Sequence, residues 1–136
     1  MSAATLTHVY EDRFGEVIDH AEDGYLEIRW YDTTEDMSAD DFRSWVAAFA
    51  GEVERRRRPG ILVDVTRFLM DQSDMDDDWW YEQIVPRYNA AGVEKFAFLA
   101  RDGMPAIGSP PAAARGANFP TGYFARRQEA LNWLGS

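Results

Sequence analysis

Short apolar runs that alternate with helical patterns constrain the fold of this chain more than any other feature. Ile61–Val65 (ILVDV) and Glu94–Ala100 (EKFAFLA) are two such runs, and a helical pattern separates them. Strands that read as continuous apolar runs are usually buried on both faces, which requires helices on both sides of a sheet. The pattern predicts an α/β fold with a mixed, mostly parallel sheet of about five strands and helices on its faces. The length of 136 residues suits a single domain spanning residues 1–136.

Shorter strands are predicted before these runs, near Val9, at 16–19 and at 25–31. In the segment YLEIRWY at 25–31, the odd-numbered positions form a mixed polar face and the even-numbered positions an apolar face. Both histidines, His8 and His20, fall in these N-terminal strands. No nucleophile motif accompanies them, so we expect ordinary strand residues and neither a metal site nor a catalytic triad.

The first helix is the element that the sequence defines most clearly. Ser38 is placed to cap it, and Asp41 completes an S-x-x-D capping box. Apolar residues then recur at three- and four-residue spacing and form one stripe: Phe42, Trp45, Val46, Phe49 and Val53. The helix is predicted to end in the arginines at 55–58, which suit its negative pole, before Pro59-Gly60.

The second helix carries the candidate functional surface. Ser73 can cap this helix. At 100° per residue Met75 and Trp79 fall opposite the apolar stripe, which comprises Trp80, Tyr81, Ile84, Val85, Tyr88 and Ala91. Residues 101–120 hold four prolines and three glycines, and we interpret them as a lid that contains one short helix with Ala112–Ala114 as its body. Trp79 and Met75, together with Phe119 from this loop and Tyr123, are therefore predicted to form an apolar patch or pocket beside an acidic rim.

Composition excludes several kinds of chemistry. The chain has no cysteine, which rules out disulfides, thiolate zinc sites and cysteine nucleophiles. Asp74, Asp76 and Asp78 match the start of a calcium loop, but Trp79 stands where that loop requires glycine and Val85 where it requires glutamate. The sequence also contains no glycine-rich phosphate-binding motif. We therefore expect no metal, no cofactor and no enzymatic activity.

Charge and hydropathy bear on partners and location. Residues 1–82 hold 21 acidic and 8 basic side chains, a net charge of −13 within a total of −10. Such an acidic region repels phosphate backbones, so we expect no nucleic-acid partner. No apolar run approaches the roughly 20 residues that span a bilayer, and the first residues do not resemble a signal peptide. A cytoplasmic protein that is not transmembrane is the expectation.

Two segments give the chain a resemblance to a known family. Gly92–Phe98 (GVEKFAF), and Phe124 followed by Glu129–Leu134 (EALNWL), match the pattern G-v-x-k-x-A-f and F-x-x-x-x-E-A-l-x-W-L. With these segments the chain resembles the divergent branch of the STAS-like family, relatives of bacterial anti-sigma-factor antagonists. The resemblance covers nearly the whole chain and implies a mixed sheet with helices wound around it. It also implies phosphorylation of Ser73, which lies near the position of the family's phosphorylated serine.

Two functions from different classes remain open on the sequence. The first is a non-enzymatic module of bacterial regulation that docks a protein partner around Ser73 and Trp79. The second is a protein that binds a lipid or another small apolar ligand through Trp79, Phe119 and Tyr123 beneath the lid at 101–120. The divergent STAS-like branch is also similar in outline to lipid-binding CRAL-TRIO domains, which supports the second reading. Exposed aromatic side chains leave a homodimer open as well.

Overall fold

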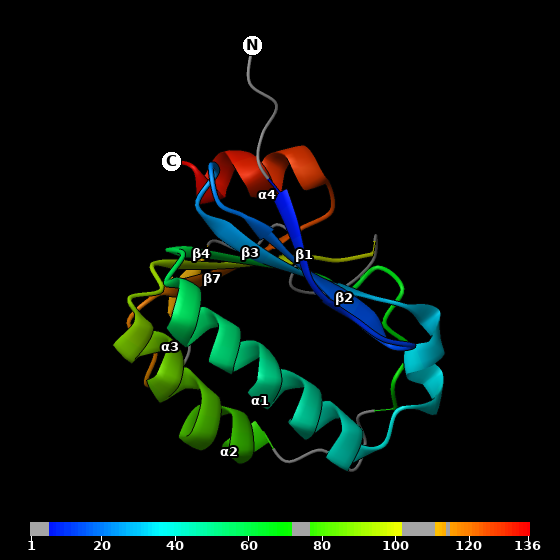
Figure 1. Cartoon of the computed structure of the whole chain (residues 1–136). Coiled ribbons are helices and arrows are strands. Elements are labelled where there is room, and N and C mark those ends of the chain that lie inside the picture. The colour runs from blue at the N-terminus through cyan, green and yellow to red at the C-terminus, as the bar shows by residue number, and fades with distance from the viewer. Residues whose placement is uncertain (1–5, 72–76, 102–110, 114) are drawn as a thin grey trace.

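The computed structural model describes residues 6–71, 77–101, 111–113 and 115–136. Their strands form one seven-stranded sheet with the order β1-β2-β3-β4-β5-β7-β6 (Figure 1). The strands are β1 (Leu6–Glu11), β2 (Gly15–His20), β3 (Tyr25–Trp30), β4 (Gly60–Asp64), β5 (Lys95–Leu99), β6 (Ala112–Ala113) and β7 (Pro120–Phe124). The α/β class is confirmed, whereas the strand count of about five is wrong.

The balance of parallel and antiparallel pairing also differs from the prediction. β1, β2 and β3 form an antiparallel meander, β3, β4, β5 and β7 are parallel, and β6 runs antiparallel to β7. The sheet is therefore evenly mixed. Two causes account for the error: the whole N-terminal meander joins the same sheet, and the predicted helix body at Ala112–Ala114 contains the two-residue strand β6 at Ala112–Ala113.

The helices divide unequally between the two faces of the sheet (Figure 1). One face is covered by α1 (Ala39–Arg56) and by a composite helix of three consecutive parts, α2 (Asp77–Trp79), η2 (Trp80–Ile84) and α3 (Val85–Ala91). The opposite face carries α4 (Arg127–Leu134), which contacts β4, β5 and β7. A short 3-10 helix, η1 (Asp32–Asp36), joins β3 to α1. No helix in the described ranges is long and apolar enough to cross a membrane.

Helix α1 forms as predicted. Ser38 Oγ accepts a hydrogen bond from Asp41 N, and the Asp41 side chain accepts one from Ser38 N, which completes the capping box. The apolar stripe is largely buried against the sheet and supplies Trp45, Val46, Phe49, Ala50 and Val53 to the larger core. Arg57 ends the helix in the left-handed conformation.

The second helix differs in register from the regular helix that we predicted. Its middle part η2 is a π-helix, in which Val85 N donates to Trp80 O, five residues earlier. Pro86 follows at once; it has no N–H to donate and disturbs regular α-helical bonding. The wider turn rotates the residues before it, so Trp79 packs partly buried against the larger core and does not point away from it. The predicted position of Trp79 opposite the buried stripe is wrong for this reason.

Candidate functional site

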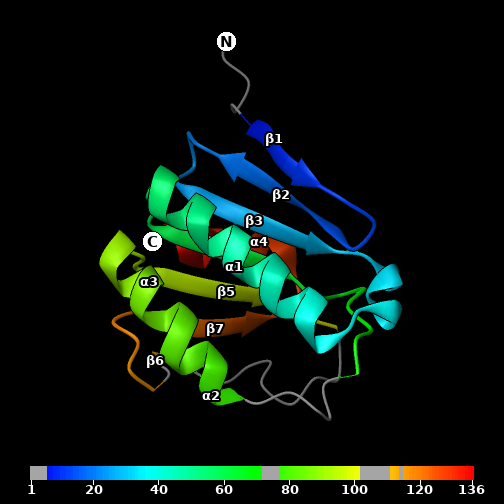
Figure 2. The same ribbon diagram turned by 60° about the horizontal axis from the view of Figure 1, so that its bottom comes forward.

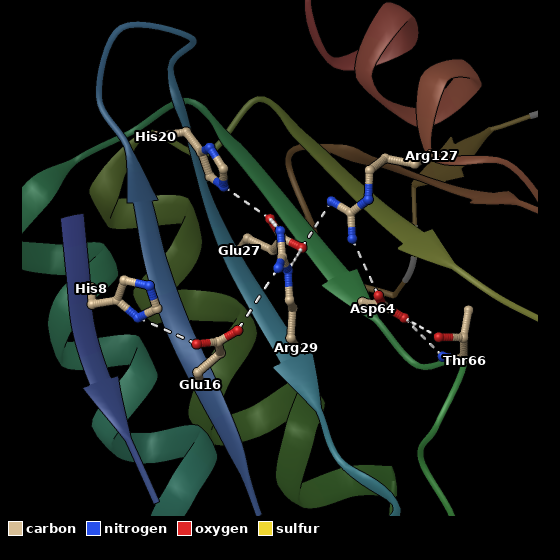
Figure 3. A network of polar contacts seen from close by, with 8 residues as sticks. All are labelled: His8, Glu16, His20, Glu27, Arg29, Asp64, Thr66 and Arg127. Carbon is tan, nitrogen blue, oxygen red and sulfur yellow. Dashed lines mark hydrogen bonds and ion pairs between the residues drawn. The ribbon is translucent and has the colours of Figure 1, made fainter. Parts of the chain in front are cut away.

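The least ordinary group in the structure is a buried carboxylate on the face of the sheet that carries α4. Glu27 lies in β3, and its side chain has no exposed surface. Its carboxylate accepts hydrogen bonds from His20 Nε2 at 2.8 Å and from Arg29 Nε at 2.7 Å. Arg127 Nη1 lies 2.9 Å from the same group. Figure 3 shows Glu27 between these three side chains, which come from β2, β3 and α4.

The partners of Glu27 decide its ionisation. Burial alone would raise the pKa of this carboxyl, but hydrogen bonds from His20 and Arg29 and the charge of Arg127 outweigh burial and lower the pKa to about 2. Glu27 is therefore ionised at neutral pH, and a carboxylate with so low a pKa is a poor general base. Burial, followed by the nearby charge of Glu27, raises the pKa of Tyr25 to about 12, and the Tyr25 ring stacks on His20 with centroids 4.2 Å apart.

A second acid extends the polar group toward the end of β4. Asp64 accepts hydrogen bonds from Thr66 N at 2.9 Å and from Thr66 Oγ1 at 2.6 Å. It also accepts one from Arg127 Nη2 at 3.2 Å. Arg127 is the first residue of α4, so a single guanidinium joins β3, β4 and α4. Asp64 is the last residue of β4, so its carboxylate has hydrogen-bond donors and also lies at a strand end.

The other end of the polar group reaches the edge strand β1. His8 Nδ1 lies 3.3 Å from Glu16 Oε2, and Arg29 Nη1 lies 3.8 Å from Glu16 Oε1. Both histidines therefore belong to one polar network, which comprises His8, Glu16, His20, Glu27, Arg29, Asp64, Thr66 and Arg127 (Figure 3). Three carboxylates face two arginines in this network, and no nucleophile with an adjacent free base is among them. Within the described ranges, no group of three or more metal-ligating side chains is placed to hold an ion.

Much of this network could not be assigned from sequence, although a signal for it existed. The odd-numbered positions of β3 form a mixed polar face in the sequence, and a polar residue at the centre of a strand in the middle of a sheet requires partners. The decisive partner, Arg127, lies 100 positions away from Glu27 in the sequence. No local pattern predicts such a contact.

The predicted patch is only partly described by the structure. Ser73 and Met75 lie outside the described residues, and so do 102–110 and 114 of the predicted lid. Trp79 and Tyr123 are half-buried, and the Tyr123 ring stacks on Phe98 with centroids 5.1 Å apart. Phe119 is only 2% exposed, because it packs in the larger core, and it therefore belongs to no open surface.

The part of the loop that precedes β7 is fixed to α3. Asn89 Nδ2 donates to Gly116 O at 2.8 Å, and Asn118 N donates to Asn89 Oδ1 at 2.8 Å. Arg115 lies over the Tyr81 ring, 4.5 Å from its centroid, and pairs with Asp78 at 3.0 Å. These contacts hold Phe119 in place and tie this segment to the composite helix.

The loop after β4 presents a residue that the sequence analysis did not single out. Leu69 is 42% exposed and follows Phe68, whose ring lies 5.3 Å from Trp30 and 6.1 Å from Phe42. Leu69 N donates a 2.9 Å hydrogen bond to Oγ1 of Thr34, itself fully buried. The only available signal was the apolar triplet 68–70, which begins four positions after the last residue of β4.

No family model, curated protein or solved structure shows a significant match to this chain. The STAS-like resemblance therefore stays a prediction that rests on the segments at 92–98 and 124–134.

Proposed function

We propose that the chain is a non-enzymatic, cytoplasmic regulatory module that docks a protein partner through the loop after β4 and the start of the composite helix. The observation that carries this proposal is the exposed side chain of Leu69, four positions before Ser73. The STAS-like resemblance supports it, because it points to docking and to phosphorylation in the same segment.

The backbone around Leu69 is held firmly while its side chain faces water. The Phe68 ring is anchored between Trp30 and Phe42, and the bond from Leu69 N to Thr34 fixes the next peptide. Loss of backbone freedom on binding is small for a segment that is already ordered. Covering the exposed part of a leucine contributes about 1 kcal/mol to binding. Leu69 is thus suited to act as a preorganised anchor.

The charges around Leu69 indicate what the partner presents. Asp32, Glu35 and Asp36 in η1 and Asp71 in the loop are exposed acidic residues close to Leu69 in the fold or in the sequence. Arg67 pairs with Asp32 at 3.4 Å. A polar rim around an apolar centre is the usual arrangement of a protein interface, and opposite charge on the partner favours the correct encounter. The proposed partner therefore carries basic side chains around an apolar pocket.

Capture experiments with matched variants test this function. Leu69→Ser removes the anchor, and Tyr10→Ser is the control, because Tyr10 is the other large hydrophobic residue found exposed in the described ranges, at 47%. A partner identified by mass spectrometry and then purified should bind Leu69→Ser about tenfold more weakly and Tyr10→Ser as tightly as the wild type. Equal binding by Leu69→Ser would remove the basis of the proposal.

Phosphorylation of Ser73 is the regulatory part of the proposal, and the resemblance alone supports it. Mass spectra of the protein isolated from cells grown under several conditions should contain the Ser73 phosphopeptide. Ser73→Ala should then abolish the modified species and change partner capture. An unmodified Ser73 under every condition would leave a docking module without this switch.

A second candidate, binding of a lipid or another apolar ligand, rests on half-buried aromatic residues near the C-terminal ends of β5 and β7. Phe98 and Tyr123 stack there and stay partly exposed, and so do Trp79 and Trp80 on the adjoining helix. Ligands of α/β proteins commonly bind outside the carboxyl ends of parallel strands. Native mass spectra of the purified protein mixed with oleate would reveal a bound fatty acid, and Tyr123→Ala should weaken it. A spectrum of free protein alone would exclude this candidate for that ligand.

A further inference from the structure

The two edge strands of the sheet differ in length. At one edge β6 has only two residues, so it offers little backbone to a further strand. At the other edge β1 has six residues, and no strand of the described chain pairs with its outer side. Figure 2 shows β1 at the border of the sheet. A long open edge is a template for pairing with another strand.

The sequence of β1 does little to prevent such pairing. LTHVYE contains the strand-favouring residues Thr7, Val9 and Tyr10 and has neither lysine nor proline. One irregularity interrupts the register with β2, between His8 and Tyr10. Tyr10 is 47% exposed, and the His8 side chain is 62% exposed. The edge is therefore accessible in both its backbone and its side chains.

Within the described ranges Glu11 of β1 has no cationic partner, whereas Glu16 opposite it lies 3.3 Å from His8 and 3.8 Å from Arg29. Glu11 lies directly opposite Glu16 in the register of β1 with β2, and like charges in opposed positions are destabilising. Glu11 accepts a hydrogen bond from the Tyr31 hydroxyl at 2.5 Å, which supplies no positive charge. A cation placed beside Glu11 from outside the sheet would offset this repulsion.

We propose that β1 pairs antiparallel with β1 of a second copy of this chain, so that His8 of each copy lies opposite Glu11 of the other. His8 pairs with Ile18 and Glu11 pairs with Glu16 in β2. Ile18 and Glu16 are two positions apart and share a face, so His8 and Glu11 lie on the same face of the sheet, the face of the polar network. Val9 and Tyr10 both pack toward the core on the helix side. Opposed residues in antiparallel pairs share a face. In this register His8 and Glu11 therefore meet on the face of the polar network, and Val9 and Tyr10 meet on the helix side.

The twofold symmetry of the pairing favours a second copy over an unrelated strand. An isologous interface repeats every contact, so one His8–Glu11 match per chain gives two imidazole–carboxylate pairs. Each pair brings the imidazole of one copy next to Glu11 of the other. The backbone bonds of β1 join the two sheets into one, and this inference does not depend on the docking function of Leu69.

A charge-swap series analysed by sedimentation velocity over a wide concentration range tests the pairing. The wild type should show a monomer–dimer equilibrium. His8→Glu sets two carboxylates opposite each other, and Glu11→Lys removes the carboxylate that accepts from the imidazole; each should raise the dimer dissociation constant about tenfold. The double variant His8→Glu/Glu11→Lys sets opposite charges against each other and should dimerise at least as tightly as the wild type. Leu69→Ser should leave the dimer unchanged, which separates this test from that of the docking function.

Circular dichroism of each variant confirms that loss of the dimer is not loss of the fold. Hydrogen exchange gives an independent readout, because the amides of 6–11 should become better protected as the protein concentration rises. A wild type that stays monomeric at every concentration would overturn the proposal. A double variant as weak as the single variants would overturn it as well, because the His8–Glu11 register would then be wrong.

Discussion

Two buried acids in the N-terminal meander, Asp19 and Glu27, lie on opposite faces of the sheet and are neutralised in different ways. Asp19 faces α1 and accepts hydrogen bonds from Arg56 Nη1 at 2.8 Å and from Arg58 Nε at 2.9 Å. Glu27 faces α4 and is surrounded by a histidine and two arginines. Each acid fastens a helix to the sheet, because Arg56 belongs to α1 and Arg127 to α4.

The two attachments differ in how much apolar packing supports them. Helix α1 has 18 residues and buries a stripe of large side chains in the larger core. Helix α4 has eight residues and rests on a smaller cluster in which Ala130 is its only fully buried residue. Polar links are therefore a larger share of what holds α4. Similar ion pairs therefore contribute unequally to the attachment of a helix when the helices they hold are unequally buried.

Removal of the Glu27 charge should cause the largest loss of stability. Glu27→Gln keeps the shape of the side chain but removes the buried carboxylate that Arg29 and Arg127 share, and leaves them only Glu16 and Asp64. Because the folded-state pKa falls from 4.5 to about 2, the charge stabilises the fold by about 3 kcal/mol. The free energy of unfolding in urea should fall by that amount. A loss below that of the matching Asp19 variant would contradict the ranking of the two acids.

Asp19→Asn is the matched variant on the other face. Its two arginines keep access to water, and α1 stays attached through its apolar stripe, so we expect a loss of about 2 kcal/mol. Hydrogen exchange should show α1 still protected, in contrast to α4 in Glu27→Gln. Exchange of α1 as fast as that of α4 would show that apolar packing does not distinguish the two helices.

The two acids also show how far the sequence predicts this structure. The capping box at Ser38, the apolar stripe of α1 and the central strand at 61–65 follow from local patterns, and all three are present. The partners of Asp19 and Glu27 come from elements far away in the sequence, and no periodicity encodes them. The position predicted for Trp79 differs for another reason, since one π-turn before Pro86 changes which residues share a face.

Acid should destabilise the protein in a window set by Glu27. The pKa of Glu27 is depressed in the folded state, so its stabilisation is complete above the ordinary value of 4.5 and is lost as the pH falls toward about 2. By about pH 3 the loss from this residue alone should reach about 2 kcal/mol. Arginine hydrogen bonds also lower the pKa of Asp19, which adds to the same trend. When the free energy of unfolding in urea is measured at a series of pH values, it should depend less steeply on pH in Glu27→Gln than in the wild type. An unchanged pH dependence would contradict the role of Glu27 in acid destabilisation.

The smallest effect tests the attachment of α4 directly. Arg127→Leu removes the link to Glu27 and Asp64 but leaves Glu27 with His20 and Arg29, so the global loss should be only about 1 kcal/mol. Arg126→Leu is the control, because the exposed Arg126 pairs only with Glu129, at 3.4 Å, among the interactions described. Hydrogen exchange should show the α4 amides opening faster in Arg127→Leu alone, since this short helix has little apolar packing to replace the lost link. Equal exchange in the two variants would mean that the smaller core holds α4 without the polar network, and the contrast with α1 would then disappear.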